Sequence, residues 1–414
     1  MKLPRIVGLN QLADETAMAN EEEMYVREAM NVDIDSTGNV SRREGYELLI
    51  TGSGFHSLYS TSRGVLMACQ RGNLGYIDLF NNAFVSLLAM GNTFRTSYTE
   101  MNGNLYVCNS DFSCMFKNSL LDTAYPIGVP LPTVRPQFDA DLSEGALPAG
   151  RYGITYTVVS ADGEESGLGE TVEVELTSQG SILMSFLTII PGYGYRVYMT
   201  TTNGDELYQA AEFDADRTFY NVMELKIGRQ PDTKHLEPPP YGHIIEAFNS
   251  RLLIGSTNFV YFTEAFRPHL HDSAHGFVPI VKAASMIRSV GDGVFIGDDR
   301  GVHYYKSKDP ESWTVGQASP YKVIYGTDII VPGTHFRGPI AEFDEVVVWL
   351  SGVGYQIGLP TGEVISANAG QVKLPPYVLG STAFVIRDGR KQLISPVNSN
   401  LLAGAGVALD SSIT

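Results

Sequence analysis

A cluster of imidazole and carboxylate side chains is the clearest candidate for metal chemistry in this sequence. His269, His271, Asp272 and His275 lie within the segment RPHLHDSAH. In an extended segment the first two histidines would share one face, and imidazole suits zinc or iron. No matching remote pair of ligands accompanies them. We therefore keep His269, His271 and His275 as candidate metal ligands, but expect no metal and a loop whose ring stacks on a neighbour.

A second candidate site is the segment NVDIDSTGNV, which resembles the start of a calcium-binding loop. Asp33, Asp35 and Gly38 provide its opening, and Thr37 and Glu44 would stand at the fifth and twelfth positions. The match is partial. A hairpin turn whose Asp and Ser side chains stabilise the backbone is the simpler interpretation.

Catalytic signatures are missing from the sequence. There is no GxSxG elbow, HExxH pair, Walker loop or GxGxxG opening a helix. Asp298, Asp299 and Glu345 lie near expected strand ends and could pair as a glycosidase dyad, but surface carboxylates are numerous in so acidic a chain. We expect no enzymatic activity, no catalytic residues and no cofactor.

Five segments of the chain repeat one local pattern. In each, a turn of Gly, Asn, Asp or Ser accompanies an apolar strand, often with a second strand that carries aromatic residues. Turn chemistry and alternating burial together predict a β-hairpin. Such a unit cannot bury its face alone, so neighbours must stack or close. The segments are 62–79, 101–116, 248–264, 291–307 and 343–359.

The spacing of these repeats predicts an inserted module. The gaps between successive repeats are 39, 147, 42 and 52 residues, measured between Leu66, Leu105, Leu252, Val294 and Val346. Removing residues 134–236, 103 in all, reduces the long gap to 44 residues. A repeat of about 40 to 50 residues is the size of a four-stranded propeller blade. We expect an all-β fold, a β-propeller-like ring of about five to seven small blades with one insert.

The insert has its own alternating pattern. Tyr152, Ile154 and Tyr156 fall on one face of an extended segment, and Asp162 with Gly163 supplies a turn. This pattern predicts a β-sandwich of the immunoglobulin or fibronectin type III kind.

The two ends of the chain fit neither pattern. Residues 1–50 are expected to form an extended arm with one helical turn around residues 21–30 and a hairpin turning at residues 36–39. The predicted division is 1–50 arm and hairpin, 51–133 first part of the propeller, 134–236 inserted sandwich, 237–396 second part of the propeller and 397–414 C-terminal tail.

Composition narrows the classes of function. The chain has 46 acidic and 29 basic residues and a net charge of −17, and a field of that sign repels phosphate backbones. Sequence-specific binding of nucleic acid is disfavoured, whereas a channel wall along which DNA slides is compatible. Cys69, Cys108 and Cys114 form no CxxC unit and are expected to be reduced core residues of a protein assembled in a cytosol. We expect neither a secretory signal nor membrane insertion.

Several segments resemble one known family. Residues 8–47, GLNQLADETAMANEEEMYVREAMNVDIDSTGNVSRREGYE, resemble the opening of the tail and head-to-tail proteins of short-tailed bacteriophages, in which a GLN segment precedes an ANVDxDxxGxxxRRxGY hairpin. Residues 150–170, 238–272 and 291–313 are similar to later segments of that family, in the same order. These motifs are structural rather than catalytic. Relatives tend to carry an aromatic residue such as Trp in place of His271, which favours packing over metal binding.

The resemblance implies a β-propeller hub or nozzle that stabilises packaged DNA. Such proteins form a ring, usually a homohexamer, below the portal and adaptor, and their central channel passes double-stranded DNA without sequence-specific contacts. The ring retains the genome and then delivers it. The implied location is the virion tail, after assembly in the host cytoplasm, and the implied partners are tail adaptor and fibre or needle proteins.

We therefore hypothesise a structural virion protein with no stable membrane insertion, whose arm and inserted sandwich contact neighbouring subunits or adaptor proteins. The favoured contact elements are residues 9–28 of the arm and its hairpin. Arg42 and Arg43 could bind a phosphate or a partner's carboxylate, and a solvated pair is the alternative. The alternative function is a carbohydrate-binding or glycoside-cleaving propeller in which Tyr304, Tyr305 and Trp313 stack on sugars. The predicted contact residues are Leu9, Asn10, Asp14, Glu15, Arg42 and Arg43.

Overall fold

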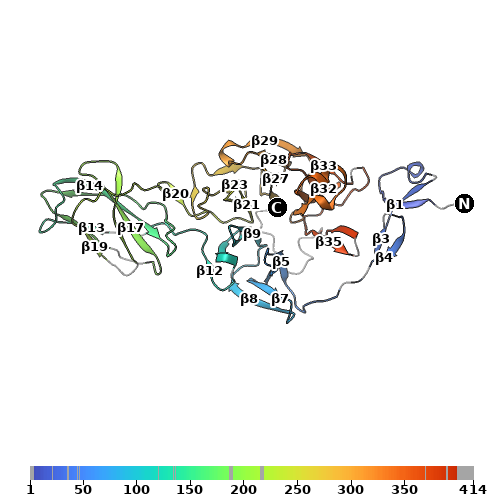
Figure 1. Ribbon diagram of the computed structural model, residues 1–414, viewed down its shortest axis with the longest axis horizontal. Helices are drawn as coiled ribbons and strands as arrows, with labels where there is room; N and C mark the ends of the chain where they lie inside the picture. The colour runs from blue at the N-terminus through green and yellow to red at the C-terminus, as the bar shows by residue number, and fades with distance from the viewer. Residues whose placement is uncertain are drawn as a thin grey trace.

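The computed structural model has an all-β fold made of many small sheets (Figure 1). Its only helical elements in the described part of the chain are short 3-10 turns. The structure describes residues 4–20, 22–34, 37–43, 45, 47–119, 121–133, 135, 137–185, 190–214, 219–368, 370–387 and 390–398.

Five four-stranded antiparallel sheets form the body of the protein, and in each the strands follow chain order from one edge to the other. Sheet 1 contains β5 (Phe55–Ser60), β6 (Leu66–Gln70), β7 (Asn73–Asp78) and β8 (Ala83–Ala89). Sheet 2 contains β9 (Ser97–Met101), β10 (Asn104–Asn109), β11 (Phe112–Phe116) and β12 (Ala124–Tyr125). Sheet 3 contains β21 (Ile244–Phe248), β22 (Arg251–Gly255), β23 (Phe259–Phe262) and β25 (Phe277–Pro279).

Two further four-stranded sheets and three strand pairs complete the body. Sheet 4 contains β26 (Met286–Val290), β27 (Gly293–Asp298), β28 (Gly301–Lys306) and β29 (Thr314–Ser319). Sheet 5 contains β30 (Ile329–Pro332), β31 (Glu345–Ser351), β32 (Gly354–Gly358) and β33 (Val364–Ser366). The pairs are β20 (Leu236–Glu237) with β24 (His271–Asp272), β34 (Leu379–Gly380) with β37 (Val397–Asn398), and β35 (Ala383–Arg387) with β36 (Arg390–Ile394).

The five predicted hairpins are confirmed, and each supplies the second and third strands of one sheet. Arg71 and Gly72, which join β6 to β7 in the first hairpin, have φ of 48° and 81°. Asn102 and Gly103, which lead from β9 into the second hairpin, have φ of 52° and 80°. Consecutive positive values of this kind suit a two-residue hairpin turn. The local sequence therefore determines the hairpins.

Side chains that point alternately to the two faces of a strand pack each sheet against the next one. Leu105 and Val107 in β10 pack toward sheet 1, whereas the intervening Tyr106 and the following Cys108 pack toward sheet 3. Further shared cores join sheet 3 to sheet 4, sheet 4 to sheet 5, and sheet 5 to the β35–β36 hairpin. Because alternate side chains point to opposite faces of a strand, one sheet contributes to two cores, and the sheets stack face to face in chain order.

The insert forms two antiparallel sheets around one core. One sheet has the order β13, β16, β19 and the other β15, β14, β17, β18. Both sheets contribute to the same buried cluster, with Tyr152 and Ile154 from one and Ile182 and Met184 from the other. The strands are β13 (Gln137–Asp141), β14 (Gly150–Val159), β15 (Val172–Leu176), β16 (Ser181–Ser185), β17 (Gly194–Thr200), β18 (Leu207–Phe213) and β19 (Phe219–Val222).

The arm forms a β-strand where a helical turn was predicted. Residues 23–26 of the expected turn form β2 (Glu23–Val26), which pairs in parallel with β1 (Arg5–Leu9), and the arm's one described helical turn is η1 (Glu15–Ala17). The hairpin prediction is confirmed by β3 (Val32–Ile34) and β4 (Val40–Arg42), while residues 35 and 36 of its turn lie outside the described residues. Of the predicted tail, residues 399–414 also lie outside them.

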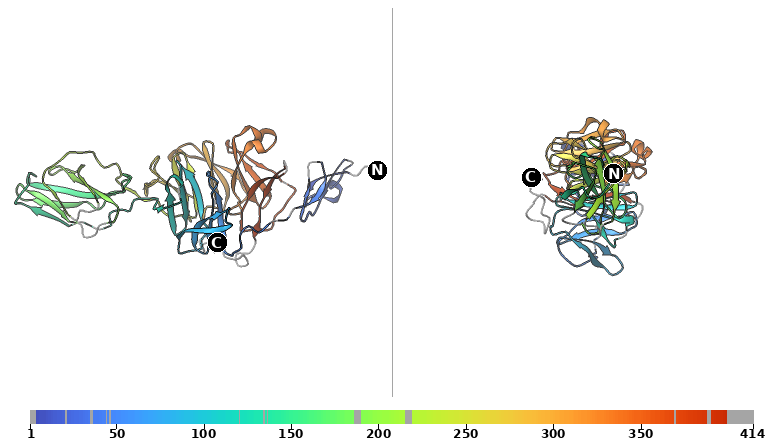
Figure 2. Two further views of the ribbon diagram at one scale, coloured as in Figure 1. Left: turned by 60° about the horizontal axis from the view of Figure 1, so that its bottom comes forward. Right: turned by 90° about the vertical axis from the view of Figure 1, so that its left-hand side faces the viewer.

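The molecule is elongated, with the insert at one end, the body in the middle and the arm at the other end (Figures 1 and 2). None of the helical elements in the described ranges is long and apolar enough to cross a membrane.

Candidate assembly surfaces and central cavity

The first strands of the five sheets line one cavity in the body. Its volume is about 740 Å³. Each first strand contributes, and the β35–β36 hairpin adds Phe384; the lining includes Tyr59, Thr99, Glu246, Arg288 and Ile329. The cavity is therefore central to the body.

Two buried carboxylates and a partly exposed arginine bridge three consecutive sheets at this cavity. Arg288 of β26 lies with Nη1 2.9 Å from Glu246 of β21 and Nε 2.7 Å from Asp328, just before β30. Ser289 donates its backbone N–H and its hydroxyl to Glu246. Burial lowers the pKa of Arg288, but Asp328 and Glu246 outweigh it and hold that pKa above its usual value. The guanidinium thus stays charged and joins sheets 3, 4 and 5.

A second arginine joins segments far apart in the chain. Arg95, just before β9, donates to the carbonyl oxygens of Gly380 at 3.1 Å and Gly326 at 3.3 Å. Its guanidinium lies 4.9 Å from the ring centre of Tyr325. The second sheet is therefore linked directly to the C-terminal part of the body.

Sequence reasoning missed these arginines and their partners. A signal was present, because Glu100, Glu246 and Arg288 each interrupt an otherwise uncharged first strand: SYTEM, IIEAF and MIRSV. A charge in a buried strand is costly unless paired, so its recurrence at corresponding strands indicates a common polar centre.

The arm contains no fully buried side chain in its described residues, 4–20, 22–34, 37–43, 45 and 47–50. It meets the body where the backbone N–H of Gln11 donates to Gln371 O at 2.7 Å. Met30 and Leu48 are 83% and 79% exposed. The described part of the arm thus exposes apolar surface and contains no core of its own.

The predicted contact residues all lie in this arm, where several have local roles. Asn10 accepts from the backbone N–H groups of Leu12 and Ala13, and Asp14 caps η1 by accepting from Thr16. Leu9 lies in β1 opposite Val26.

The charged residues among these predicted contacts differ in whether they already have an ion-pair partner in the structure. Arg43 donates to Asp33 at 3.1 Å, so the hairpin uses both residues, and Asp33 is occupied by an arginine rather than poised for calcium. Glu15 and Arg42 are exposed and have no ion pair with any described residue. Glu15 and Arg42 therefore remain open for a partner.

The candidate histidines of the segment 267–275 lie in different surroundings. His271 is buried, hydrogen bonds to Phe262 O and packs edge-to-face on Tyr261 with ring centres 5.4 Å apart. His275 points to solvent beside Asp272. The described residues contain no group of three metal-binding side chains. The His271 ring does pack on a neighbour, but edge-to-face and from the short strand β24 (His271–Asp272) rather than stacked and from a loop.

His269 lies instead at the junction of insert and body. Its Nδ1 is 3.5 Å from Glu164 Oε1. Burial lowers the pKa of His269 to about 4, with a smaller effect from Arg267, and burial raises the pKa of Glu164. Lys117 of the body pairs with Asp162 of the insert nearby. Polar contacts thus attach the insert.

The residues considered for carbohydrate chemistry are occupied by packing. Tyr304 and Tyr305 are buried, and Trp313 packs against Tyr305 with ring centres 5.2 Å apart. Asp298 pairs with Arg300, and Asp299 pairs with Lys282 and Lys322. Glu345 lines a different cavity from these two aspartates. The structure therefore does not bring Glu345 together with these two aspartates.

No family model and no curated protein matches the chain. Among solved structures, the chain is similar to the extracellular domain of a one-component system from B. thetaiotaomicron, at 9% identity, covering 87% of this chain and 39% of that one, with a TM-score of 0.30. This chain therefore spans about two fifths of that structure. A second similar structure is PorZ, a surface component of the type-IX secretion system of Porphyromonas gingivalis. The match has 11% identity and a TM-score of 0.20, and it covers 86% of this chain and 52% of PorZ. The AfRom2 CNH domain matches at 8% identity with a TM-score of 0.19, and the match covers 74% of this chain and 93% of that domain. At these scores the similarities carry no statement about function.

Proposed function

We propose that this protein is a structural subunit of a bacteriophage tail, a nozzle or hub that assembles into a ring, usually a homohexamer, around a DNA channel. The ring helps to retain and then deliver the genome. It is built in the host cytoplasm, belongs to the virion tail, and contacts adaptor and fibre or needle proteins. The segment resemblances at residues 8–47, 150–170, 238–272 and 291–313 support this proposal.

The proposed subunit is a propeller-like ring of sheets with an immunoglobulin-like or fibronectin-like insert. Support comes from the five sheets that stack in order and turn their first strands to one cavity. The Arg95 contacts to Gly326 and Gly380 favour closure, because they join the second sheet to the end of the body.

The observation that carries the assembly proposal is the arm. A unit with no buried side chain in its described part cannot hold itself folded by its own core. Its exposed apolar residues need a cover, and a neighbouring subunit or adaptor provides one. A ring built head to tail pairs two different surfaces of each copy, and an arm at one end of an elongated chain (Figure 2) suits that geometry.

The proposed DNA path lies between copies rather than through the centre of one. A cavity of 740 Å³ corresponds to a cube of about 9 Å, narrower than the roughly 12 Å major groove of B-DNA alone. Arg288 and its acidic partners also span that cavity. A net charge of −17 suits a wall that does not grip phosphate.

The deciding experiment measures oligomeric mass by light scattering and images the same sample by negative stain, with and without a tail adaptor. We expect a closed ring, most simply of six copies. A protein that remains monomeric at high concentration with the adaptor present would contradict the proposal.

A further inference from the structure

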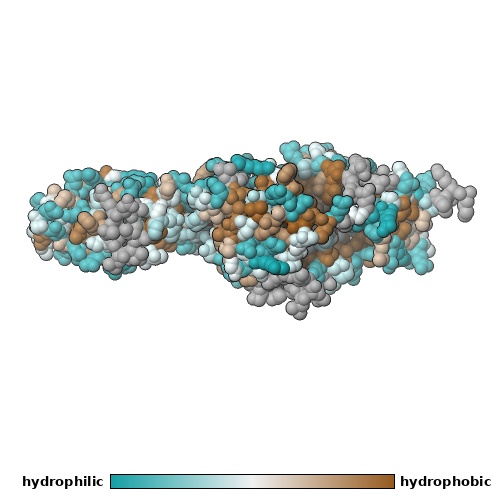
Figure 3. Space-filling view, turned by 90° about the horizontal axis from the view of Figure 1, so that it is seen from below, coloured by the Kyte–Doolittle hydropathy of each residue, from teal (hydrophilic) through white to brown (hydrophobic). Residues whose placement is uncertain are grey.

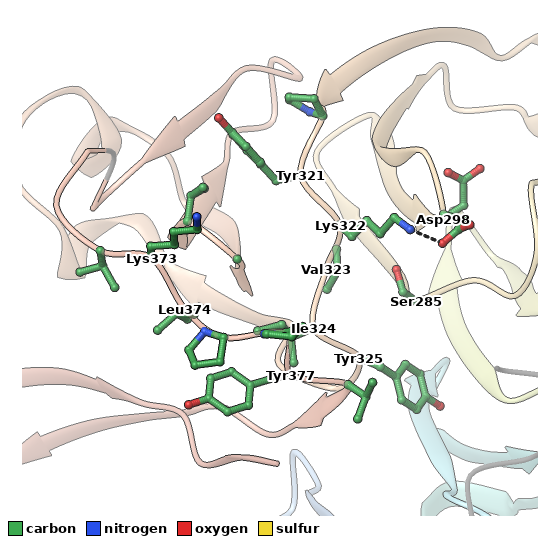
Figure 4. A pocket seen from close by; sticks show the side chains of 18 of the residues that line it. Ser285, Asp298, Tyr321, Lys322, Val323, Ile324, Tyr325, Lys373, Leu374 and Tyr377 are labelled. Atoms are coloured by element: carbon green, nitrogen blue, oxygen red, sulfur yellow. Dashed lines mark hydrogen bonds and ion pairs between the residues drawn. The ribbon is translucent and has the colours of Figure 1, made fainter. Parts of the chain in front are cut away.

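A cavity between sheets 4 and 5 has apolar walls. Its volume is about 730 Å³. Figure 4 shows Tyr321, Val323 and Ile324 on one side facing Leu374 and Tyr377 on the other. Tyr321 is 45% exposed. This surface is accessible and apolar in a region where the sheets are otherwise tightly packed.

The rim of this cavity is basic, although the chain as a whole is acidic. Lys282 and Lys322 both pair with Asp299, at 3.0 and 2.5 Å. Lys373 is exposed and has no ion pair with any described residue. The rim therefore has cationic charge left over, and it suits an apolar segment that carries carboxylates.

The arm carries such a segment and already lies at the mouth of the cavity. Leu12 is one of the lining residues, and the preceding Gln11 donates to Gln371. Leu12 nevertheless stays 51% exposed, so it covers the mouth without filling the cavity. Asp14 and Glu15 follow directly and are exposed.

We propose that this cavity is the receptor for the arm of a second copy of the chain, with Leu12 seated between sheets 4 and 5 and the acidic turn of Asp14 and Glu15 against Lys373. The inference deepens the proposed ring, on which it rests, by naming the two surfaces that meet. Each copy then gives its arm to one neighbour and receives an arm from the other, as a head-to-tail ring requires.

The chain can reach a neighbour. Residues 43–54 connect β4 to β5, and Leu48 and Leu49 in this connection are 79% and 50% exposed. Twelve extended residues span up to about 40 Å. Exchange of an element between identical copies reuses the same contacts and costs little beyond association.

Crosslinking between differently tagged chains tests the exchange. One chain carries Leu12→Cys and the other Lys373→Cys, and the two are co-assembled and treated with a short bismaleimide. The native thiols are buried, so the wild-type protein serves as the blank. We expect a covalent species that carries both tags. A chain with both substitutions should give multimers larger than dimers.

Charge reversal provides a second measurement. Lys373→Glu should lower the oligomeric mass at least twofold at a fixed concentration, and adding Glu15→Lys in the same chain should restore it. Lys308→Glu, an exposed lysine outside this cavity, is the matched control and should leave the mass unchanged.

Two results would overturn the inference, and they differ in what they say about the ring. If rings form but the doubly substituted chain is linked only within itself, the arm docks on its own body and ring assembly uses other surfaces. If the wild-type chain is monomeric under all conditions, the inference and the proposed function fail together.

Discussion

At the scale of single residues, the cysteines behave as core residues. Cys69, Cys108 and Cys114 are free and buried, and burial raises the pKa of each thiol, that of Cys114 to about 12. Because the thiolate is the reactive form, we expect less than about 0.1 equivalent to react with a thiol reagent at pH 7.5, and all three after denaturation. Rapid modification of the native protein would show that the body opens.

The Arg288 network should be the most sensitive charged group in the body. Arg288→Met leaves Glu246 and Asp328 buried without their cation, which costs about 3–5 kcal/mol. Urea denaturation followed by tryptophan fluorescence measures this effect, because both tryptophans, Trp313 and Trp349, lie in the body.

Two controls accompany that variant. Arg151→Met removes a solvent-exposed ion pair with Glu173 and should change stability by less than about 1 kcal/mol. Combining Arg288→Met with Glu246→Gln and Asp328→Asn should recover most of the loss. Equal effects of Arg288→Met and Arg151→Met would show that the network is not a buried one.

The lowered pKa of His269 predicts that the folded protein loses stability in mild acid. Its pKa is about 4 in the folded chain and about 6.5 when unfolded, so the unfolded state binds more protons between these values. Stability therefore falls as the pH drops from about 6.5 to 4, by at most about 3 kcal/mol. Thermal melting between pH 7.5 and 4.5 should show a smaller decline for His269→Gln than for the wild type. His275→Gln, at an exposed histidine, should lose as much thermal stability with falling pH as the wild type. Identical losses in all three proteins would show that His269 does not contribute to the acid sensitivity.

At the scale of elements, a glycine fixes the junction of insert and body. A Cβ on Gly167 would overlap the carbonyl oxygen of Leu236 and lie 3.0 Å from Leu131. We expect Gly167→Val to loosen the insert and to increase its release by limited proteolysis several-fold. Gly316→Val is the control, because nothing lies within 4 Å of a Cβ there. Equal cleavage of the two variants would contradict a close junction.

The hairpins were predictable at this scale because their causes are local. Turn residues such as Asn102 and Gly103 and alternating apolar residues act within a few positions of the chain. The predicted helical turn was wrong because residues 23–26 have a strand partner in residues 5–9, a pairing that no local pattern reveals.

At the scale of the whole molecule, the arm should contribute to ring assembly but not to the thermal stability of the body. Deleting residues 1–50 removes no side chain that is buried in the described structure, so the thermal midpoint of the body should change by less than about 2 °C. The same deletion should reduce the ring to smaller species in light scattering. A large drop in the midpoint would show that the arm stabilises its own body.

The sequence by itself determined the repeated hairpins, the all-β character of the chain and the burial of its cysteines, because turn chemistry and period-two alternation depend only on neighbouring residues. The tertiary structure decided which strands meet at the centre. Arg95 reaches Gly380 across 285 residues, and Arg288 finds Glu246 and Asp328 some 40 residues away on either side. Such partners are selected by the stacking of sheets, which depends on residues far apart in the chain.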